Sequence, residues 1–188
     1  MGNGEQAGRR SEEKVTMRLD RISPFKSKKT LRVVIETPKG SRNKYDYDPA
    51  ARAIVLSRTL PEGMVFPFNF GFIPRTRGED GDPLDVLVLM DEPVTPGVVV
   101  FSRVIGLLCA TQSEGSKRER NDRYLAVALT SLEFKSIHHA KRLPAHIMEQ
   151  IEKFFVTYNE LCGRKFTPLK VLGPTRAMQT IAESRRPK

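Results

Sequence analysis

Short apolar runs separated by turn-forming residues make up most of the chain between residues 31 and 129. Runs of this kind, rich in Val, Ile and Leu and bounded by Gly, Pro, Asn or Asp, are typical of β-strands. The pattern predicts strands at 31–36, 86–90 and 124–129, a hairpin of 44–47 with 53–56, and one long strand or two strands over 98–108.

Helical periodicity begins only after residue 144. Pro144 precedes apolar residues that share one helical face, and Gly163 follows as a stop signal. The apolar positions are Ile147, Met148, Ile151, Phe154, Phe155 and Tyr158. A second helix is predicted from Pro174, with Met178, Ile181 and Ala182 turned inward. Many short strands followed by helices predict an α+β, mainly β fold: a closed, largely antiparallel barrel with helices packed outside.

Composition and charge place this barrel in a globular protein of 188 residues, with 39% hydrophobic and 29% charged residues. Residues 1–28 are polar and charge-rich, which predicts a basic N-terminal arm, mobile or packed at the periphery, before a single domain over 29–188. Two cysteines without a CxxC spacing indicate a reduced, cytoplasmic setting, and no apolar run is long enough to span a membrane.

The candidate chemistry lies directly before the predicted strand 86–90, where Asp80, Asp82 and Asp85 come close together around Gly81 and Pro83. Like charges at this spacing raise one another's pKa unless a cation neutralises them. Oxygen donors without nearby imidazole or sulfur suit Mg²⁺, which is commonly held by a few carboxylates together with substrate phosphates. The segment therefore predicts a magnesium site for phosphate chemistry. A solvated acidic turn is the alternative, and the spacing does not fit an EF-hand.

Several segments resemble the soluble family I inorganic pyrophosphatases over residues 30–172. DGDPLDV at 80–86 is similar to the family's signature, VIETPKGSRNKYD at 34–46 to its first block, and FPFNFGFI at 66–73 to its aromatic block. Phe154, Phe155 and Tyr158 resemble its long helix. The resemblance implies an OB-like five-stranded barrel that hydrolyses inorganic diphosphate to two phosphates with Mg²⁺. It also implies a homo-oligomer, commonly a hexamer in bacterial members.

The same resemblance assigns roles to the acids. It makes Asp80 and Asp85 metal ligands and Glu36 a further acid at a cluster of several Mg²⁺ ions. Asp82 becomes the general base beside the metals, since a nearby carboxylate can take the proton of a metal-bound water. Asn121 falls at a position where additional ions bind in the family.

The cationic clamp implied by the resemblance falls on Lys44, Arg58 and Arg123. Arginine can grip phosphate oxygens with two donors at once, whereas lysine acts as a point charge. Tyr158 would donate its hydroxyl to a phosphate, although its place on the apolar helix face suits core packing equally well.

The sequence also departs from the family's pattern. Gln112 and Asn121 stand where Asp is usual, Phe66 and Phe70 where Tyr is usual, and Asn159 where Lys is usual. An amide keeps a carbonyl oxygen but removes a negative charge, which weakens Mg²⁺ binding. We therefore expect a reorganised outer metal shell, with slower hydrolysis or a need for more Mg²⁺.

Two other functions remain open at this point. The neutral amides are compatible with a pyrophosphatase-like protein that binds phosphate compounds without rapid hydrolysis. The formal net charge of +10 and the aromatic block are compatible with a nucleic-acid-binding barrel that stacks bases on Phe. The acidic triplet argues against nucleic acid, because a polyanion would meet uncompensated carboxylates.

Overall fold

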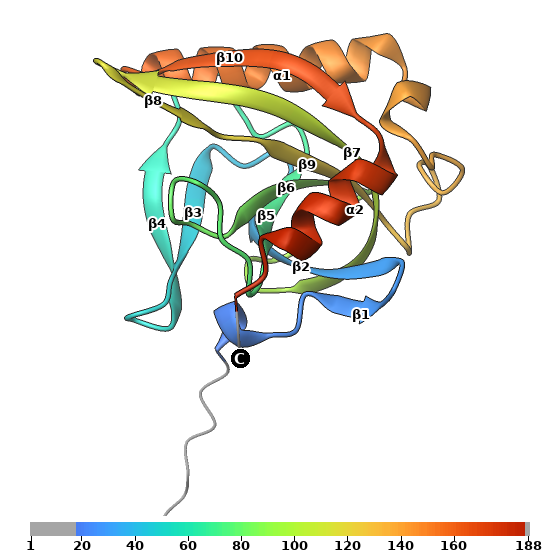
Figure 1. Ribbon diagram of the computed structural model, residues 1–188. Coiled ribbons are helices and arrows are strands. Elements are labelled where there is room, and N and C mark those ends of the chain that lie inside the picture. The colour runs from blue at the N-terminus through green and yellow to red at the C-terminus, as the bar shows by residue number, and fades with distance from the viewer. Residues whose placement is uncertain (1–17, 187–188) are drawn as a thin grey trace, which may run out of the picture.

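The computed structural model of the chain describes residues 18–186 (Figure 1). Its elements in chain order are η1 (Leu19–Arg21), β1 (Phe25–Ser27), β2 (Thr30–Thr37), β3 (Asn43–Asp48), β4 (Ala53–Thr59), β5 (Asn69–Ile73), β6 (Leu84–Leu89), β7 (Val99–Glu114), β8 (Lys117–Arg120), β9 (Arg123–Ala128), η2 (Ala140–Arg142), α1 (Ala145–Leu161), β10 (Lys165–Leu172) and α2 (Pro174–Glu183).

Five strands form a ring. β2 pairs with β5, β5 with β6, β6 with β9 and β9 with β7, and a further pairing of β7 with β2 completes the circle. All of these pairs are antiparallel except β6 with β9, which run parallel. The predicted mainly β fold with a five-stranded ring and flanking helices is therefore confirmed.

β7 is one continuous strand of 16 residues, which decides between the two arrangements left open by the sequence. Its first part pairs with β2 and β9, and its last part pairs with β8 and β10. A single strand can pair with four others because it is longer than the ring and extends beyond it, as Figure 1 shows. The charged segment after residue 113 is thus the β7–β8 hairpin rather than a loop.

The two helices cover different parts of the barrel. The α1 face closes one core cluster, with Ile151, Phe154 and Phe155 buried, as the periodicity predicts. α2 packs against β7 and closes a second cluster. In α2, Ala177 and Ile181 are buried whereas Ala182 is exposed, so the prediction that Ala182 points inward is wrong. One step along the helix turns a side chain by about 100°, enough to move it out of the contact.

The strands β5 and β10 were not predicted from the sequence, and there is a physical reason why each was missed. Every residue of β5 is buried, so the strand shows no alternation between apolar and polar positions. β10 contains Pro168 and exposed lysines, and it pairs only with β7 at the edge of the sheet. Proline is tolerated at such an edge, where no second neighbour needs its missing N–H.

The predicted N-terminal arm lies largely outside the described residues. The part that is described, 18–28, holds η1 and β1 against the domain: Leu19 is buried, and the backbone N–H of Arg75 donates to the carbonyl oxygen of Asp20 at 3.1 Å. No helix within residues 18–186 has the length and apolar character needed to cross a membrane.

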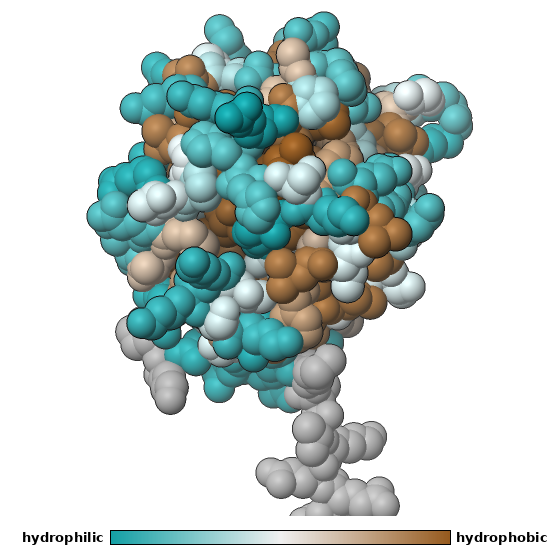
Figure 2. Space-filling view, turned by 90° about the vertical axis from the view of Figure 1, so that its right-hand side faces the viewer, coloured by the Kyte–Doolittle hydropathy of each residue, from teal (hydrophilic) through white to brown (hydrophobic). Residues whose placement is uncertain are grey.

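Hydrophobic side chains reach the surface in small groups between hydrophilic ones, as Figure 2 shows for one side of the molecule. The most exposed large apolar residues are Leu132, at 72%, Leu56, at 59%, and Leu169, at 57%. They lie on different elements, so they do not define one patch.

Candidate active site

The acidic signature forms a closed turn between β5 and β6. The carboxylate Oδ1 of Asp80 accepts the backbone N–H of Asp82 at 3.1 Å, and the N–H of Gly78 donates to the carbonyl oxygen of Asp82 at 2.7 Å. Gly81, at the tip, has φ +94°, a conformation that residues with a Cβ rarely adopt. Asp85 follows inside β6, so the rigid strand fixes its position relative to the turn.

A cavity of about 720 Å³ opens beside this turn. All of the predicted site residues except Arg58 line it: Glu36, Lys44, Asp80, Asp82, Asp85, Asn121, Arg123 and Tyr158. They come from β2, β3, the signature turn, β6, β9 and α1, so the folded barrel gathers side chains from distant parts of the chain.

The two cations predicted on the β3–β4 hairpin have different surroundings. Lys44 lines the cavity, and its ammonium group contacts the Asp46 carboxylate, which also lines it. Arg58, on β4, is exposed, and its Nη1 donates to the Sγ of Cys162 at 2.9 Å. Arg58 therefore lies next to the end of α1 and does not reach the cavity wall in this conformation.

Glu36 is the most deeply buried acid of the cavity, with 7% of its surface exposed. Burial raises the pKa of Glu36 to about 8, although its carboxylate accepts the backbone N–H of Tyr47 at 2.7 Å, which opposes the rise. Burial also raises the pKa of Asp80 and of Asp85, and at Asp85 the Arg123 guanidinium opposes this effect. Three carboxyl groups of one cavity are thus short of compensating positive charge.

The raised pKa of Glu36 makes the stability of the metal-free protein depend on pH. The carboxyl titrates at its ordinary value of 4.5 when unfolded and at about 8 when folded. Its favourable contribution is therefore complete below pH 4.5 and is lost as the pH rises through 8. In a chelating buffer, we expect the free energy of unfolding to fall between about pH 5 and pH 9, by an amount on the order of a few kcal/mol. Urea unfolding of Glu36→Gln, which cannot titrate, should show a shallower decline, and an unchanged slope would contradict this prediction.

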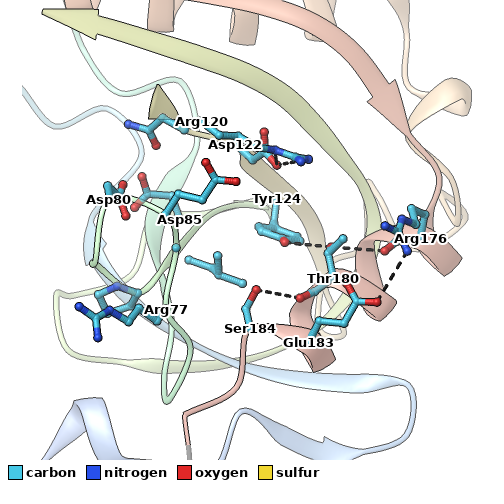
Figure 3. Close-up of a pocket in the computed structure, with 15 residues that line it drawn as sticks. Arg77, Asp80, Asp85, Arg120, Asp122, Tyr124, Arg176, Thr180, Glu183 and Ser184 are labelled. Carbon is cyan, nitrogen blue, oxygen red and sulfur yellow. Dashed lines mark hydrogen bonds and ion pairs between the residues drawn. The ribbon is translucent and has the colours of Figure 1, made fainter. Parts of the chain in front are cut away.

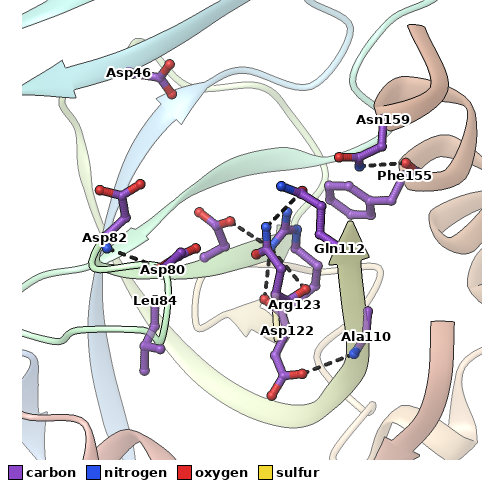
Figure 4. Close-up of polar contacts among 12 residues, drawn as sticks. Asp46, Asp80, Asp82, Leu84, Ala110, Gln112, Asp122, Arg123, Phe155 and Asn159 are labelled. Carbon is purple, nitrogen blue, oxygen red and sulfur yellow. Dashed lines mark hydrogen bonds and ion pairs between the residues drawn. The ribbon is translucent and has the colours of Figure 1, made fainter. Parts of the chain in front are cut away.

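Arg123 lies at the inner end of the cavity with 5% of its surface exposed. Its Nη1 is 2.8 Å from Oδ2 of Asp85, contacts Oδ1 of Asn121 and donates to the carbonyl oxygen of Asp122 at 3.0 Å (Figure 4). The guanidinium carbon stands 4.9 Å from the ring centre of Phe155, a cation–π arrangement. The arginine is consequently held by oxygen atoms on one side and an aromatic wall on the other.

The residues that depart from the family's pattern also line the cavity, and the three amides among them make hydrogen bonds inside the protein. Asn121 Nδ2 donates to Oε1 of Gln112 at 3.0 Å. Asn159 is 2% exposed, and its side-chain amide donates to the carbonyl oxygen of Phe155 one turn earlier on α1, at 2.8 Å. Asn159 therefore stabilises its own helix, and it adds no positive charge to the cavity wall.

Tyr158 lies between the aromatic core and the cavity. Its ring packs among aromatic side chains, 5.9 Å from Phe154 and 6.1 Å from Phe66 between ring centres, while the residue also lines the cavity. Burial raises the pKa of the Tyr158 hydroxyl above its ordinary value, so the hydroxyl keeps its proton and remains a hydrogen-bond donor.

A second cavity, of about 400 Å³, lies on the other side of the signature turn and shares Asp80 and Asp85 with the first (Figure 3). The end of α2 forms its far wall, where the hydroxyl of Tyr124 donates to Oγ1 of Thr180 at 3.0 Å. Asp80 and Asp85 are therefore part of a thin wall that α2 supports from behind.

Sequence reasoning did not identify Asp46, although a signal was available. Asp46 follows Lys44 by two positions on β3, and alternate residues of a strand share a face, so both point to the cavity. Other charged lining residues, Lys117, Arg164 and Arg186, come from β8, the α1–β10 turn and the end of the chain. Nothing in the linear sequence connects these segments with the signature.

The fold and the site together define a β-barrel protein with a polar, carboxylate-rich cavity. The family model of inorganic pyrophosphatase matches residues 33–187. The inorganic pyrophosphatase of Thermus thermophilus is 40% identical over 148 residues, which is 79% of this chain and 82% of that protein. Soluble inorganic pyrophosphatase 5 of Arabidopsis thaliana is 38% identical over 152 residues, 81% of this chain and 68% of that protein. This chain belongs to the inorganic pyrophosphatase family, and it is an inorganic diphosphatase.

Solved structures agree with this assignment. The crystal structure of inorganic pyrophosphatase from Thermus thermophilus superposes with a TM-score of 0.82 at 34% identity and covers 89% of this chain and 97% of that one. The inorganic pyrophosphatase structure from Neisseria gonorrhoeae superposes with a TM-score of 0.78 at 29% identity, covering 88% and 96%. The predicted family, soluble family I inorganic pyrophosphatase, and the predicted enzyme class are confirmed.

Proposed function

We propose that the chain hydrolyses inorganic diphosphate in a Mg²⁺-dependent reaction in which Asp82 is the general base. The observation that carries the proposal is one cavity that collects the four predicted acids, Glu36, Asp80, Asp82 and Asp85, together with Lys44 and Arg123. Diphosphate is a small, highly charged anion, so its cleavage needs both cations that neutralise it and a base that takes a proton from water.

The acids fit a hard divalent ion by their chemistry. Glu36, Asp80, Asp82 and Asp85 offer only oxygen donors, and desolvation leaves most of them in need of positive charge. Within residues 18–186, no three His, Cys, Asp or Glu side chains gather closely enough to hold one ion alone. Mg²⁺ commonly uses one or two carboxylates and completes its shell with water and phosphate oxygens. When bound, Mg²⁺ would neutralise diphosphate and lower the pKa of the attacking water.

Asp82 is the best-placed base among these acids. Glu36 is buried, Asp85 pairs with Arg123, and the carboxylate of Asp80 holds the turn through a backbone N–H. The side chain of Asp82 has neither a hydrogen bond nor an ion pair within the described residues, and it lies exposed at the cavity mouth. It is therefore free to accept a proton.

Lys44, Arg123 and the Tyr158 hydroxyl are proposed to bind the phosphates. Arg58 keeps its predicted role as part of the clamp only if its guanidinium leaves Cys162 when substrate arrives. A donor to a charged phosphate is strongly favourable in a desolvated site, because the hydrogen bond is charge-assisted.

Replacement of Lys44 by Met tests the clamp. We expect kcat/KM for diphosphate to fall about tenfold or more, because a charge-assisted contact to phosphate is lost. Lys39→Met is the matched control: this lysine lies in the same block, but its ammonium donates to the backbone carbonyl of Asp91 at 3.2 Å and does not line the cavity. Equal losses in both variants, measured by phosphate release, would argue against a substrate role for Lys44.

Binding without rapid hydrolysis is the competing function, and the neutral Gln112–Asn121 pair favours it. Phosphate release from diphosphate with excess Mg²⁺, compared with the same reaction in chelator, decides between the two. Hydrolysis that requires Mg²⁺ supports the proposal, whereas a rate no higher than that of Asp82→Asn supports binding only. Diphosphate should also be cleaved in preference to longer polyphosphates and nucleotides.

The remaining proposals concern the setting of the enzyme. A homo-oligomer, for which the resemblance suggests a hexamer, rests on the resemblance alone, and sedimentation analysis tests it. Two free cysteines support a reduced, cytoplasmic location. We propose no nucleic-acid or membrane partner, and the acids of the cavity argue against nucleic acid because a polyanion would meet uncompensated carboxylates. The division into an arm, 1–28, and a domain, 29–188, stays a prediction.

A further inference from the structure

Arg123 occupies a position where the backbone leaves it little choice of partner. β6 and β9 run parallel, with Val86 opposite Tyr124. The preceding residues, Asp85 and Arg123, therefore lie side by side at the same end of the two strands. The ion pair of 2.8 Å between Nη1 and Oδ2 follows from this register.

One nitrogen of the Arg123 guanidinium, Nη1, contacts several oxygen atoms. Nη1 of Arg123 faces a carboxylate oxygen of Asp85, the amide oxygen of Asn121 and the backbone oxygen of Asp122. An array of carboxylate, amide and backbone oxygens around one positive centre is also the environment that a hard divalent ion requires. Arginine stays charged at any physiological pH, so this centre is permanently filled.

The side-chain amides of Asn121 and Gln112 are oriented so that an oxygen atom faces the guanidinium. Asn121 turns its oxygen to Arg123 and its nitrogen to Gln112, whose Oε1 accepts at 3.0 Å. Both amide oxygens are thereby used inside the protein. The positive charge of Arg123 balances the single negative charge of Asp85, and Gln112 and Asn121 add none. The formal charges of these four side chains therefore sum to zero without a metal ion.

The aromatic wall keeps the guanidinium in place. The rings of Phe155 and Phe166 lie 4.9 Å and 5.5 Å from its central carbon, on α1 and β10. A lysine could supply the charge but not the flat face that stacks on these rings. Nη2 makes no hydrogen bond within the described residues, so the proposed contact with phosphate remains open to it.

We propose that the Arg123 guanidinium takes the place of a divalent ion at the inner end of the cavity, and that divalent ions bind only on the side of Glu36, Asp80, Asp82 and the Oδ1 oxygen of Asp85, which does not face Arg123. The inference rests on the proposed Mg²⁺ dependence, and it deepens that proposal by assigning one of the site's positive charges to the chain itself. The enzyme therefore binds fewer divalent ions than a site with acids at positions 112 and 121 would hold.

Metal titration without substrate tests this directly. Mn²⁺ alone is titrated into the full chain, and the number of bound ions is measured by calorimetry and by the electron paramagnetic resonance of free Mn²⁺. We expect Arg123→Gln, which removes the charge but keeps a polar side chain, to bind one more Mn²⁺ per chain than the unmodified protein. Arg123→Lys, which keeps the charge, should bind the same number as the unmodified protein. A folded Arg123→Gln chain with an unchanged number of ions overturns the inference.

A second variant keeps the test decisive if Arg123→Gln does not fold. In Asn121→Asp the new carboxylate should pair with Arg123, so the number of bound Mn²⁺ ions should stay unchanged. The triple variant with Gln112→Asp, Asn121→Asp and Arg123→Lys carries two more negative charges than the chain itself, and it should bind Mn²⁺ at least tenfold more tightly. An additional ion in Asn121→Asp alone would mean that Arg123 does not block the site, and would overturn the inference. If the unmodified chain binds no Mn²⁺ at all, the proposed metal dependence fails first and this inference fails with it.

Discussion

Replacement of Asp82 by Asn is expected to lower kcat for diphosphate hydrolysis by about 10²–10⁴-fold, the range in which a positioned general base contributes. Asn keeps the size and polarity of the side chain but accepts no proton at neutral pH. Because Asp82 is exposed and its backbone, not its carboxylate, closes the turn, the midpoint of thermal unfolding should change little. Phosphate release and circular dichroism measured on the same preparation separate loss of catalysis from loss of fold.

Glu79→Gln is the matched control for this variant. Glu79 is an exposed acid three positions before Asp82, but it does not line the larger cavity. Its replacement removes the same charge from the same turn, and we expect kcat to stay within about twofold, since the added field of an exposed charge is largely screened. If both variants lose activity equally, the effect belongs to the net charge of the turn, and Asp82 is not the base.

The largest expected effect on stability comes from Gly71→Ala. Gly71 lies in the middle of β5 opposite Ile35 of β2, and a Cβ there would stand 1.9 Å from the carbonyl oxygen of Val34. The atoms that this Cβ would meet belong to the backbone of Val34 and Ile35 in β2, so no flexible side chain could move out of its way. We expect the free energy of unfolding to fall by about 3 kcal/mol or more, as measured by urea denaturation.

Gly115→Asn provides the contrast. Gly115, in the β7–β8 turn, has φ +58°, but a Cβ at this position would have nothing within 4 Å of it. Asn tolerates this left-handed conformation better than other residues with a side chain. A loss of about 1 kcal/mol or less is expected. If Gly71→Ala proved as mild as Gly115→Asn, the close pairing of β5 with β2 would be wrong.

The replacement of acids by amides acquires a physical meaning once Arg123 is considered. In sequence, Gln112 and Asn121 only suggest weakened metal binding. In the folded chain Asn121 accepts from the guanidinium, which pairs directly with Asp85, and Asn121 donates to Gln112, so the two amides add hydrogen bonds without adding charge. If Arg123 replaces one ion as proposed, the site needs fewer ions from solution, and the neutral amides are compatible with full activity.

The local features of this protein were readable from the sequence. The tight turn of the acidic signature depends on Gly81 and on residues within a few positions of it, and the face of α1 depends on spacing within one helix. Backbone preference and periodicity act over such short distances, so these elements were predicted where they occur. Eight of the nine site residues that the resemblance implied line the cavity, whereas Arg58 does not and Asp46 was missed.

Only the tertiary structure decided which distant groups meet. β5 is buried on both faces and shows no period, and β10 exists because β7 extends past the ring and offers it an edge. The direction of Arg58 toward Cys162, and the pairing of Arg123 with Asp85, depend on contacts between segments far apart along the chain. Such contacts arise from the packing of the whole barrel, and no local pattern of residues encodes them.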